Sequence, residues 1–338
     1  MSVSSKKLVF CEFGNPAKIL KLEHEELHPP KPNEVLVRML AAPINPADVI
    51  ALKGLYPNKP SLPAVAGNEG VGEVVAVGSA VGDLRPGDRV VAQTGVNWGT
   101  WRTHAVCDAK RVFKIPKELG VVEAATMSVN PFTAYLMLKD LVTLEKGDVV
   151  VQNGANSSCG QFVIQLSSLW GYRTVNVVRD RPDIGELRRH LEDLGASYVL
   201  TEEELRDTQI FESGGVARPK LALNCVGGAS GETLAKQLAH GGTLVTYGAM
   251  SRQPVPALAP YFIYEDQTWR GFWVSAWMRK HAGSPRHLRM LAEVSRLLVE
   301  GKLKVPAHTL VPIAAFQEAL ASSEAGFKGF KYIFDFRA

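Results

Sequence analysis

The order of its short apolar segments constrains the fold of this 338-residue chain more than any other feature. Up to about residue 120, brief strand-like runs such as EVLVRML and GEVVAVG are punctuated by Gly and Pro. From about residue 123, helix-like and strand-like segments alternate, beginning with EAATMSVNPFTAYLMLKDL and VVVQNG. The first pattern is typical of a β-rich, barrel-like domain, and the second of βαβ units with a parallel sheet.

The sequence therefore predicts an α/β protein with a Rossmann-type doubly wound parallel sheet and a separate β-rich domain. A chain of this length is long enough for two domains. The last segments are strand HTLVP, helix IAAFQEALASS and strand FKYIFDF, and we expect them to rejoin the first domain. We place the β-rich domain at residues 1–122 and 305–338, and the dinucleotide-binding domain at residues 123–304.

Composition narrows the range of partners. Lys and Arg total 38 against 34 Asp and Glu, and this mild excess is spread along the chain, which favours an anionic small molecule over nucleic acid. No apolar run approaches the roughly 18 residues of a membrane span, and neither a secretory signal nor an Arg-rich presequence is visible. The cysteines form no CxxC pair, which argues against a disulfide framework and a structural zinc site: Cys11, Cys107, Cys159 and Cys225.

The segment VVVQNGANSSCGQFVIQL has the strand–turn–helix layout of a dinucleotide site. There, the helix N-terminus offers N–H groups to a pyrophosphate. If Gly160 is the third glycine of G-x-G-x-x-G, Ser157 and Ala155 replace the first two. Their small side chains still permit close approach of the backbone, although an ordinary βα turn remains the alternative.

The next strand ends at Arg179-Asp180-Arg181, about 19 residues after Gly160. NAD enzymes usually place an acid here for the ribose 2′-hydroxyl, whereas arginines can hold a 2′-phosphate. The two arginines favour NADPH. Asp180 could instead serve as the NAD-type acid, and arginines at strand ends are often merely solvated.

Glu69 lies among glycines in AVAGNEGVGEVVAVG, and here the sequence resembles the medium-chain dehydrogenase/reductase superfamily. Zinc alcohol dehydrogenases of that superfamily carry G-H-E at this place, whereas this chain has Asn68. In PINPAD, Asn45 stands where those enzymes supply a cysteine thiolate. Without these ligands we expect no metal, so the resemblance points to the zinc-free branch.

Eight stretches are similar to the mitochondrial trans-2-enoyl-CoA (2-enoyl thioester) reductases: AAPINPADVIALKGLYP, AVAGNEGVGEVVAVG, WGTWRTHAV, VNPFTAY, VVRDRPDI, LALNCVGG, GTLVTYGAM and RGFWVS. The resemblance covers nearly the whole chain. It implies a GroES-like catalytic domain with a Rossmann domain, a homodimer, NADPH as cofactor, and a place in mitochondrial fatty acid synthesis.

Position by position, the resemblance also implies a set of NADPH contacts: Asn130, Asn156, Ser157, Ser158, Cys159, Arg179, Asp180, Arg181, Tyr247, Gly248, Ala249, Met250, Phe272, Trp273, Val274 and Lys331. Each has a structural alternative. Asn130 can simply cap a helix, the run from Phe272 to Val274 can be core, and Lys331 can be a solvated charge.

The family's catalytic tyrosine maps onto Tyr56 in KGLYPNKP. Reducing an enoyl thioester needs a hydride at C3, a donor for the thioester oxygen and a proton at C2, and a tyrosine hydroxyl can donate both a hydrogen bond and a proton. The alternative is a ring packed in a Pro-rich loop. Two rival functions remain open: a quinone or alkenal reductase of the same branch, and a non-enzymatic NADPH-binding regulatory protein. The acyl carrier, CoA or acyl carrier protein, is also open.

Overall fold

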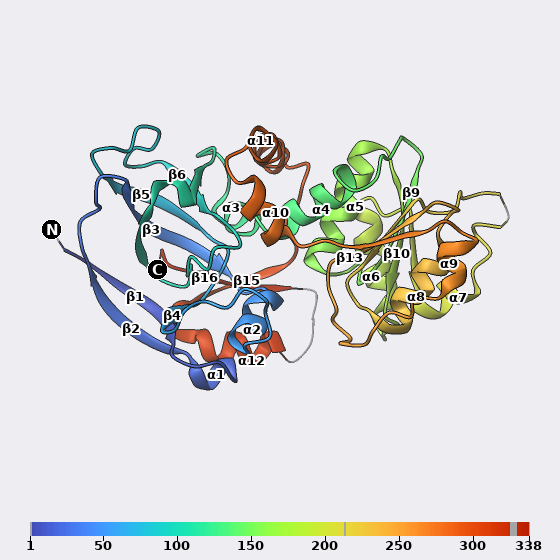
Figure 1. Cartoon of the computed structure of the whole chain (residues 1–338), viewed down its shortest axis with the longest axis horizontal. Coiled ribbons are helices and arrows are strands. Elements are labelled where there is room, and N and C mark those ends of the chain that lie inside the picture. The colour runs from blue at the N-terminus through green and yellow to red at the C-terminus, as the bar shows by residue number, and fades with distance from the viewer. Residues whose placement is uncertain (1, 213, 325–329, 338) are drawn as a thin grey trace. The chain divides into compact units, whose positions relative to one another are not determined.

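The computed structural model describes residues 2–212, 214–324 and 330–337. The chain divides into two compact units, Met1–Phe132 with Val274–Ala338, and Thr133–Trp273 (Figure 1). Among the described residues, no helix combines the length and the apolar character that a membrane span requires.

The first unit is built on two sheets, with strand orders β2-β1-β4 and β15-β16-β3-β5-β6-β8, and β7 pairs with β3. Its strands are β1 (Val3–Phe10), β2 (Lys21–Leu27), β3 (Glu34–Pro43), β4 (Ala64–Val65), β5 (Val71–Val77), β6 (Arg89–Ala92), β7 (His104–Asp108), β8 (Val112–Lys114), β15 (His308–Pro312) and β16 (Lys331–Asp335). Its helices are α1 (Pro16–Ile19), α2 (Pro46–Leu52), η1 (Ala109–Arg111), α3 (Val121–Thr126), α10 (Val274–His281), α11 (Pro285–Val299), η2 (Ile313–Ala315) and α12 (Phe316–Glu324), and α4 (Asn130–Lys139) runs into the second unit.

Strand β3 is the centre of the larger sheet because most of its residues are apolar and buried. It pairs with β5 and β7, and the C-terminal strand β16 adds antiparallel to its end. The last segments of the chain therefore lie in the first unit. Helix α12 lies next to α1 (Figure 1), and a buried cluster that includes Ile19 of α1 and Leu320 of α12 joins these distant segments.

The division into units differs from the one expected from the sequence, because α10 and α11 belong to the first unit. His287 of α11 is fully buried, and its ring lies 4.5 Å from the centroid of Phe113 and 6.1 Å from that of Phe132. Its Nδ1 accepts from the backbone N–H of Gly283, and its Nε2 has no hydrogen-bond partner among the described residues. Burial lowers the pKa of His287 to about 4.

This buried imidazole predicts a loss of stability in acid. The folded-state pKa of about 4 lies below the ordinary 6.5, so the stabilisation is present above pH 6.5 and is lost as the pH falls toward 4. Between pH 7.5 and 5 the contribution of His287 should fall by about 2 kcal/mol. Urea midpoints of the parent and of His287→Gln, followed over that range, test this. Parallel pH profiles for the two proteins would contradict it.

The second unit holds one parallel sheet with strand order β11-β10-β9-β12-β13-β14, and helices flank it (Figure 1). Its strands are β9 (Val149–Asn153), β10 (Arg173–Val178), β11 (Tyr198–Thr201), β12 (Leu221–Asn224), β13 (Thr243–Thr246) and β14 (Thr268–Gly271). Its helices are α5 (Ser158–Trp170), α6 (Ile184–Asp193), α7 (Glu202–Asp207), α8 (Gly228–Gln237) and α9 (Ala259–Ile263). Strand order reverses between β9 and β12, the point where such sheets bind dinucleotides.

Candidate active site

The turn between β9 and α5 has the backbone of a dinucleotide-binding turn, despite its unusual sequence. A Cβ on Gly160 would lie 2.5 Å from the carbonyl oxygen of Ala155, so only glycine fits where the helix approaches the strand. Ser157 is the N-cap of α5, and its hydroxyl accepts from the backbone N–H of Gly160 at 3.1 Å. A capping serine thus stands where the usual motif has its second glycine. Asn156, Ser157 and Ser158 lie at the helix N-terminus, where anions are favoured.

A row of polar side chains follows the carboxyl ends of β9, β12 and β13. The Nδ2 of Asn153 donates to Oδ1 of Asn224 at 2.8 Å, and the Nδ2 of Asn224 donates to Oγ1 of Thr246 at 3.1 Å. Asn153 and Asn224 are fully buried. These bonds fix the strand ends beside the turn. This row was not expected from the sequence, although asparagine at the ends of two predicted buried strands is a visible signal.

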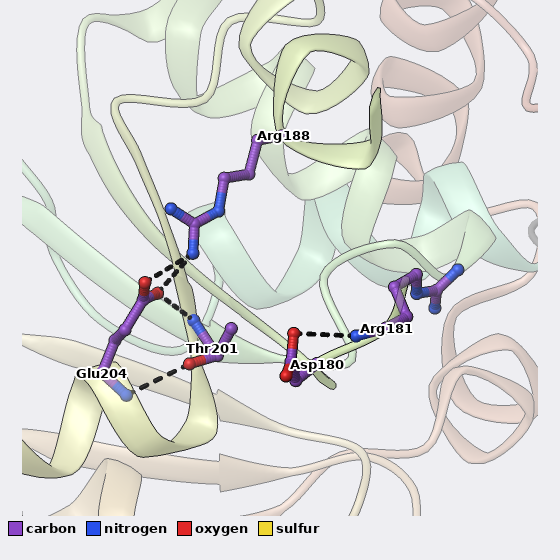
Figure 2. A network of polar contacts seen from close by, with 5 residues as sticks. All are labelled: Asp180, Arg181, Arg188, Thr201 and Glu204. Carbon is purple, nitrogen blue, oxygen red and sulfur yellow. Dashed lines mark hydrogen bonds and ion pairs between the residues drawn. The ribbon is translucent and has the colours of Figure 1, made fainter. Parts of the chain in front are cut away.

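Arg179, Asp180 and Arg181 directly follow β10, the strand beside β9. The carboxylate of Asp180 accepts from the backbone N–H of Arg181 at 2.9 Å, and the Arg181 side chain points away from it (Figure 2). Arg179 is exposed and Arg181 is partly exposed. The Asp180 carboxylate therefore makes its hydrogen bond within its own loop.

A second polar network joins α6 to the start of α7 (Figure 2). Nη2 of Arg188 donates to both carboxylate oxygens of Glu204 at 2.6 Å. Glu204 also accepts from the backbone N–H of Thr201 at 2.7 Å and donates its own N–H to the Thr201 hydroxyl at 3.1 Å. The Arg188 guanidinium holds the pKa of Glu204 below its usual value. Arg188 thus has a structural partner.

The segment from Tyr247 to Met250 follows β13 and meets the dinucleotide turn. The Tyr247 hydroxyl is buried against the thiols of Cys159 and Cys225, and this burial raises its pKa well above the usual value. A Cβ on Gly248 would lie 2.9 Å from the Cys225 carbonyl oxygen, so the backbone approach requires glycine. The structure thus brings Cys159 and Tyr247 together, whereas Ala249 and Met250 are exposed. Cys225 was not among the predicted site residues.

The segment from Phe272 to Val274 follows β14. The backbone N–H of Phe272 donates to the carbonyl of Thr246 at 3.0 Å, which extends the parallel pairing with β13. Phe272 and Trp273 are partly buried, and Val274 is buried at the start of α10.

The first unit contains a buried cluster of acids, amides and one lysine. Nδ2 of Asn45 donates to Oε2 of Glu69 at 2.8 Å, and Nζ of Lys331 donates to Oδ1 of Asn45 at 2.5 Å. Nδ2 of Asn130 lies 3.5 Å from the same Oδ1. Nδ2 of Asn68 donates to Oδ1 of Asp48 at 2.9 Å. The structure therefore brings the predicted residues Asn130 and Lys331 together through Asn45.

Burial dominates the electrostatics of this cluster. Burial raises the pKa of Asp48 to about 6, and raises that of Glu69, while the charge of Lys331 opposes both shifts. Glu69 also accepts from the backbone N–H of Val129 at 2.7 Å. Asp48 was not among the predicted site residues, although Asn45-x-x-Asp48 is a helix N-terminal pattern, and Asp48 does accept from the Asn45 N–H at 2.8 Å.

Tyr56 lies in the loop after α2 and is half-buried. Two residues further on, Nδ2 of Asn58 donates to the carbonyl oxygen of Gly95 at 3.1 Å, and Nη1 of Arg279 in α10 reaches the same oxygen at 3.4 Å. This shared acceptor ties the Tyr56 loop to the body of the first unit. Nothing in the local sequence signals such a long-range bond.

Comparisons with known proteins cover nearly the whole chain. The alcohol dehydrogenase GroES-like domain matches residues 31–117, and the zinc-binding dehydrogenase domain matches residues 159–291. The mitochondrial enoyl-[acyl-carrier-protein] reductase of Rattus norvegicus is 47% identical over 333 residues, which are 97% of this chain and 88% of that protein. The chain belongs to this reductase family.

Two solved structures of mitochondrial 2-enoyl thioester reductase are similar to this chain. The Etr1p/NADP/crotonyl-CoA complex has a TM-score of 0.90 at 33% identity and covers 98% of this chain and 100% of its own. The Etr1p/Etr2p heterodimer from Candida tropicalis has a TM-score of 0.90 at 34% identity, with the same coverage. The predicted family, the GroES-like and Rossmann fold and the oxidoreductase class are confirmed.

One of the two matching domain families is described as zinc-binding, but zinc does not fit the polar cluster of this reductase. A metal ligand must offer a lone pair, whereas Asn45 and Asn68 turn their amide N–H groups toward Glu69 and Asp48 and so act as hydrogen-bond donors. Lys331 adds an ammonium group to the same place. Within residues 2–212, 214–324 and 330–337, no group of three His, Cys, Asp or Glu side chains could hold a metal ion.

Proposed function

We propose that this chain reduces the 2,3 double bond of trans-2-enoyl thioesters with NADPH, in mitochondrial fatty acid synthesis. The observation that carries the proposal is its 47% identity, over 97% of its length, to a mitochondrial enoyl-[acyl-carrier-protein] reductase. Purified protein should oxidise NADPH when crotonyl-CoA is added, and a simple quinone should be a much poorer substrate. Preference for the quinone would instead favour the quinone-reductase alternative.

The second unit supplies the features that suit NADPH. The turn from Asn156 to Cys159 forms the N-terminus of α5, which suits a pyrophosphate, and Arg179 and Arg181 after β10 are the proposed partners of a 2′-phosphate. The proposed contacts also include Tyr247–Met250 and Phe272–Val274, together with Asn130 and Lys331 of the first unit. When bound, NADPH supplies the hydride for C3 of the substrate.

Tyr56 is the proposed catalytic residue. Its hydroxyl donates a hydrogen bond to the thioester oxygen as negative charge builds there, and then provides the proton for C2. The carrier of the acyl group is CoA or acyl carrier protein. We also propose a homodimer, which the pairing of Etr1p with Etr2p in a solved relative supports.

Zinc independence is a further part of the proposal, and it rests on the donor groups that Asn45 and Asn68 turn toward the acids. We expect activity toward crotonyl-CoA to be unchanged after extended dialysis against a strong chelator, because no step needs a metal. Metal analysis before and after dialysis should find no stoichiometric zinc. Zinc at one equivalent, with inactivation on its removal, would contradict this assignment.

A further inference from the structure

Lys331 is an unusual residue for the interior of a protein. Its side chain is buried, with 9% of the residue's surface exposed, on a strand that lies between β15 and β3. Buried lysines are rare unless the charge is paired, because removing an ammonium group from water is costly. The contacts of Lys331 should therefore explain why a charge is retained here.

Two buried carboxyl groups account for that charge. Asp48 and Glu69 are 2% and 0% exposed, and Lys331 is the cation that acts on both among the residues described. Asp48 comes from α2, Glu69 from the turn before β5, and Lys331 from β16. The charge of Lys331 therefore acts on carboxyl groups from two other segments that lie far away in the sequence.

Asn45 connects this cation to one of the acids. A lysine ammonium can only donate and a carboxylate can only accept, so the amide of Asn45 must turn its oxygen to Lys331 and its nitrogen to Glu69. Asn130 also turns its Nδ2 toward the Asn45 oxygen, at 3.5 Å. The charge of Lys331 thus determines the orientation of the amide through which Asn130 joins the cluster.

We propose that Lys331 is a positioning residue whose ammonium group serves as a built-in cation, in place of a bound metal ion, for the cluster of Asn45, Asp48 and Glu69. The inference rests on the proposed zinc independence and extends it: an amide pair and an ammonium together substitute for ligands and metal. It follows that the cluster requires a positive charge, and that a small free ammonium ion can supply it once the lysine side chain is removed.

The test measures the melting temperatures of two variants in the absence of added cofactor. Lys331→Met fills the space but removes the charge, and its melting temperature should fall by roughly 5–10 °C at pH 8 because two buried carboxylates lose their cation. The gap to the parent should narrow at pH 5.5, since Asp48, whose pKa is about 6, then takes up a proton. Lys331→Ala leaves space, so ethylammonium chloride should raise its melting temperature, whereas sodium chloride should not.

Lys331→Met is the matched control for rescue, because its side chain occupies the space and ethylammonium should not stabilise it. If Lys331→Met does not fold, combining it with Glu69→Gln should restore folding by removing the unpaired negative charge. A pH-independent gap, together with no rescue of Lys331→Ala, would overturn the inference and leave Lys331 as a packing residue. Stoichiometric zinc in the parent protein would instead contradict the proposed zinc independence, so the two failures are distinguishable.

Discussion

Replacing Tyr56 with phenylalanine should lower kcat for a short enoyl-CoA by roughly 10²–10³, while KM changes little. The substitution keeps the ring in its loop and removes only the hydroxyl. Because that donor acts mainly as charge builds on the thioester oxygen, its loss should affect the transition state more than substrate binding. Steady-state kinetics on crotonyl-CoA, with NADPH affinity measured separately, provide the test.

Tyr264→Phe is a matched control for this substitution, because Tyr264 is well exposed and has no proposed role. It should leave kcat unchanged. A smaller fall for Tyr56→Phe would still be consistent with water delivering the proton while Tyr56 positions the substrate. Wild-type kcat in Tyr56→Phe would end the assignment and leave Tyr56 as a packing residue.

Replacing both Arg179 and Arg181 with alanine should weaken NADPH binding at least tenfold and leave NADH binding almost unchanged. One charge-assisted hydrogen bond contributes about 1.5–3 kcal/mol, and the two guanidinium groups are the proposed partners of the 2′-phosphate. Asp180 is turned toward the N–H of Arg181, which favours this reading over an NAD-type acid. Fluorescence titration with each cofactor measures both affinities.

Arg206→Ala gives the control for loss of a positive charge, because Arg206 is exposed at the end of α7 and has no proposed contact with cofactor. Its affinities for both cofactors should match the parent's. If the double variant loses NADPH and NADH binding equally, the arginines support the fold of the loop and do not discriminate between the cofactors.

Much of the second unit could be predicted from the sequence, because its signals are local. The alternation of strands and helices indicates the parallel sheet, and Gly160 marks the close approach of α5 to the turn after β9 that the structure shows. The position of helix α11 could not be predicted in the same way. An amphipathic helix shows that one face is buried, but not that His287 packs against Phe113 in the first unit.

By itself, the sequence determined the family, the two kinds of domain, the dinucleotide turn and the replacement of zinc ligands by Asn45 and Asn68. These depend on residue type and short spacing. Only the tertiary structure placed Lys331 beside Asn45, 286 positions away, and buried both among acids. The physical reason is that strand pairing between β16 and β3 brings the ends of the chain together, and pairing partners at such separation leave no periodic signal in the sequence.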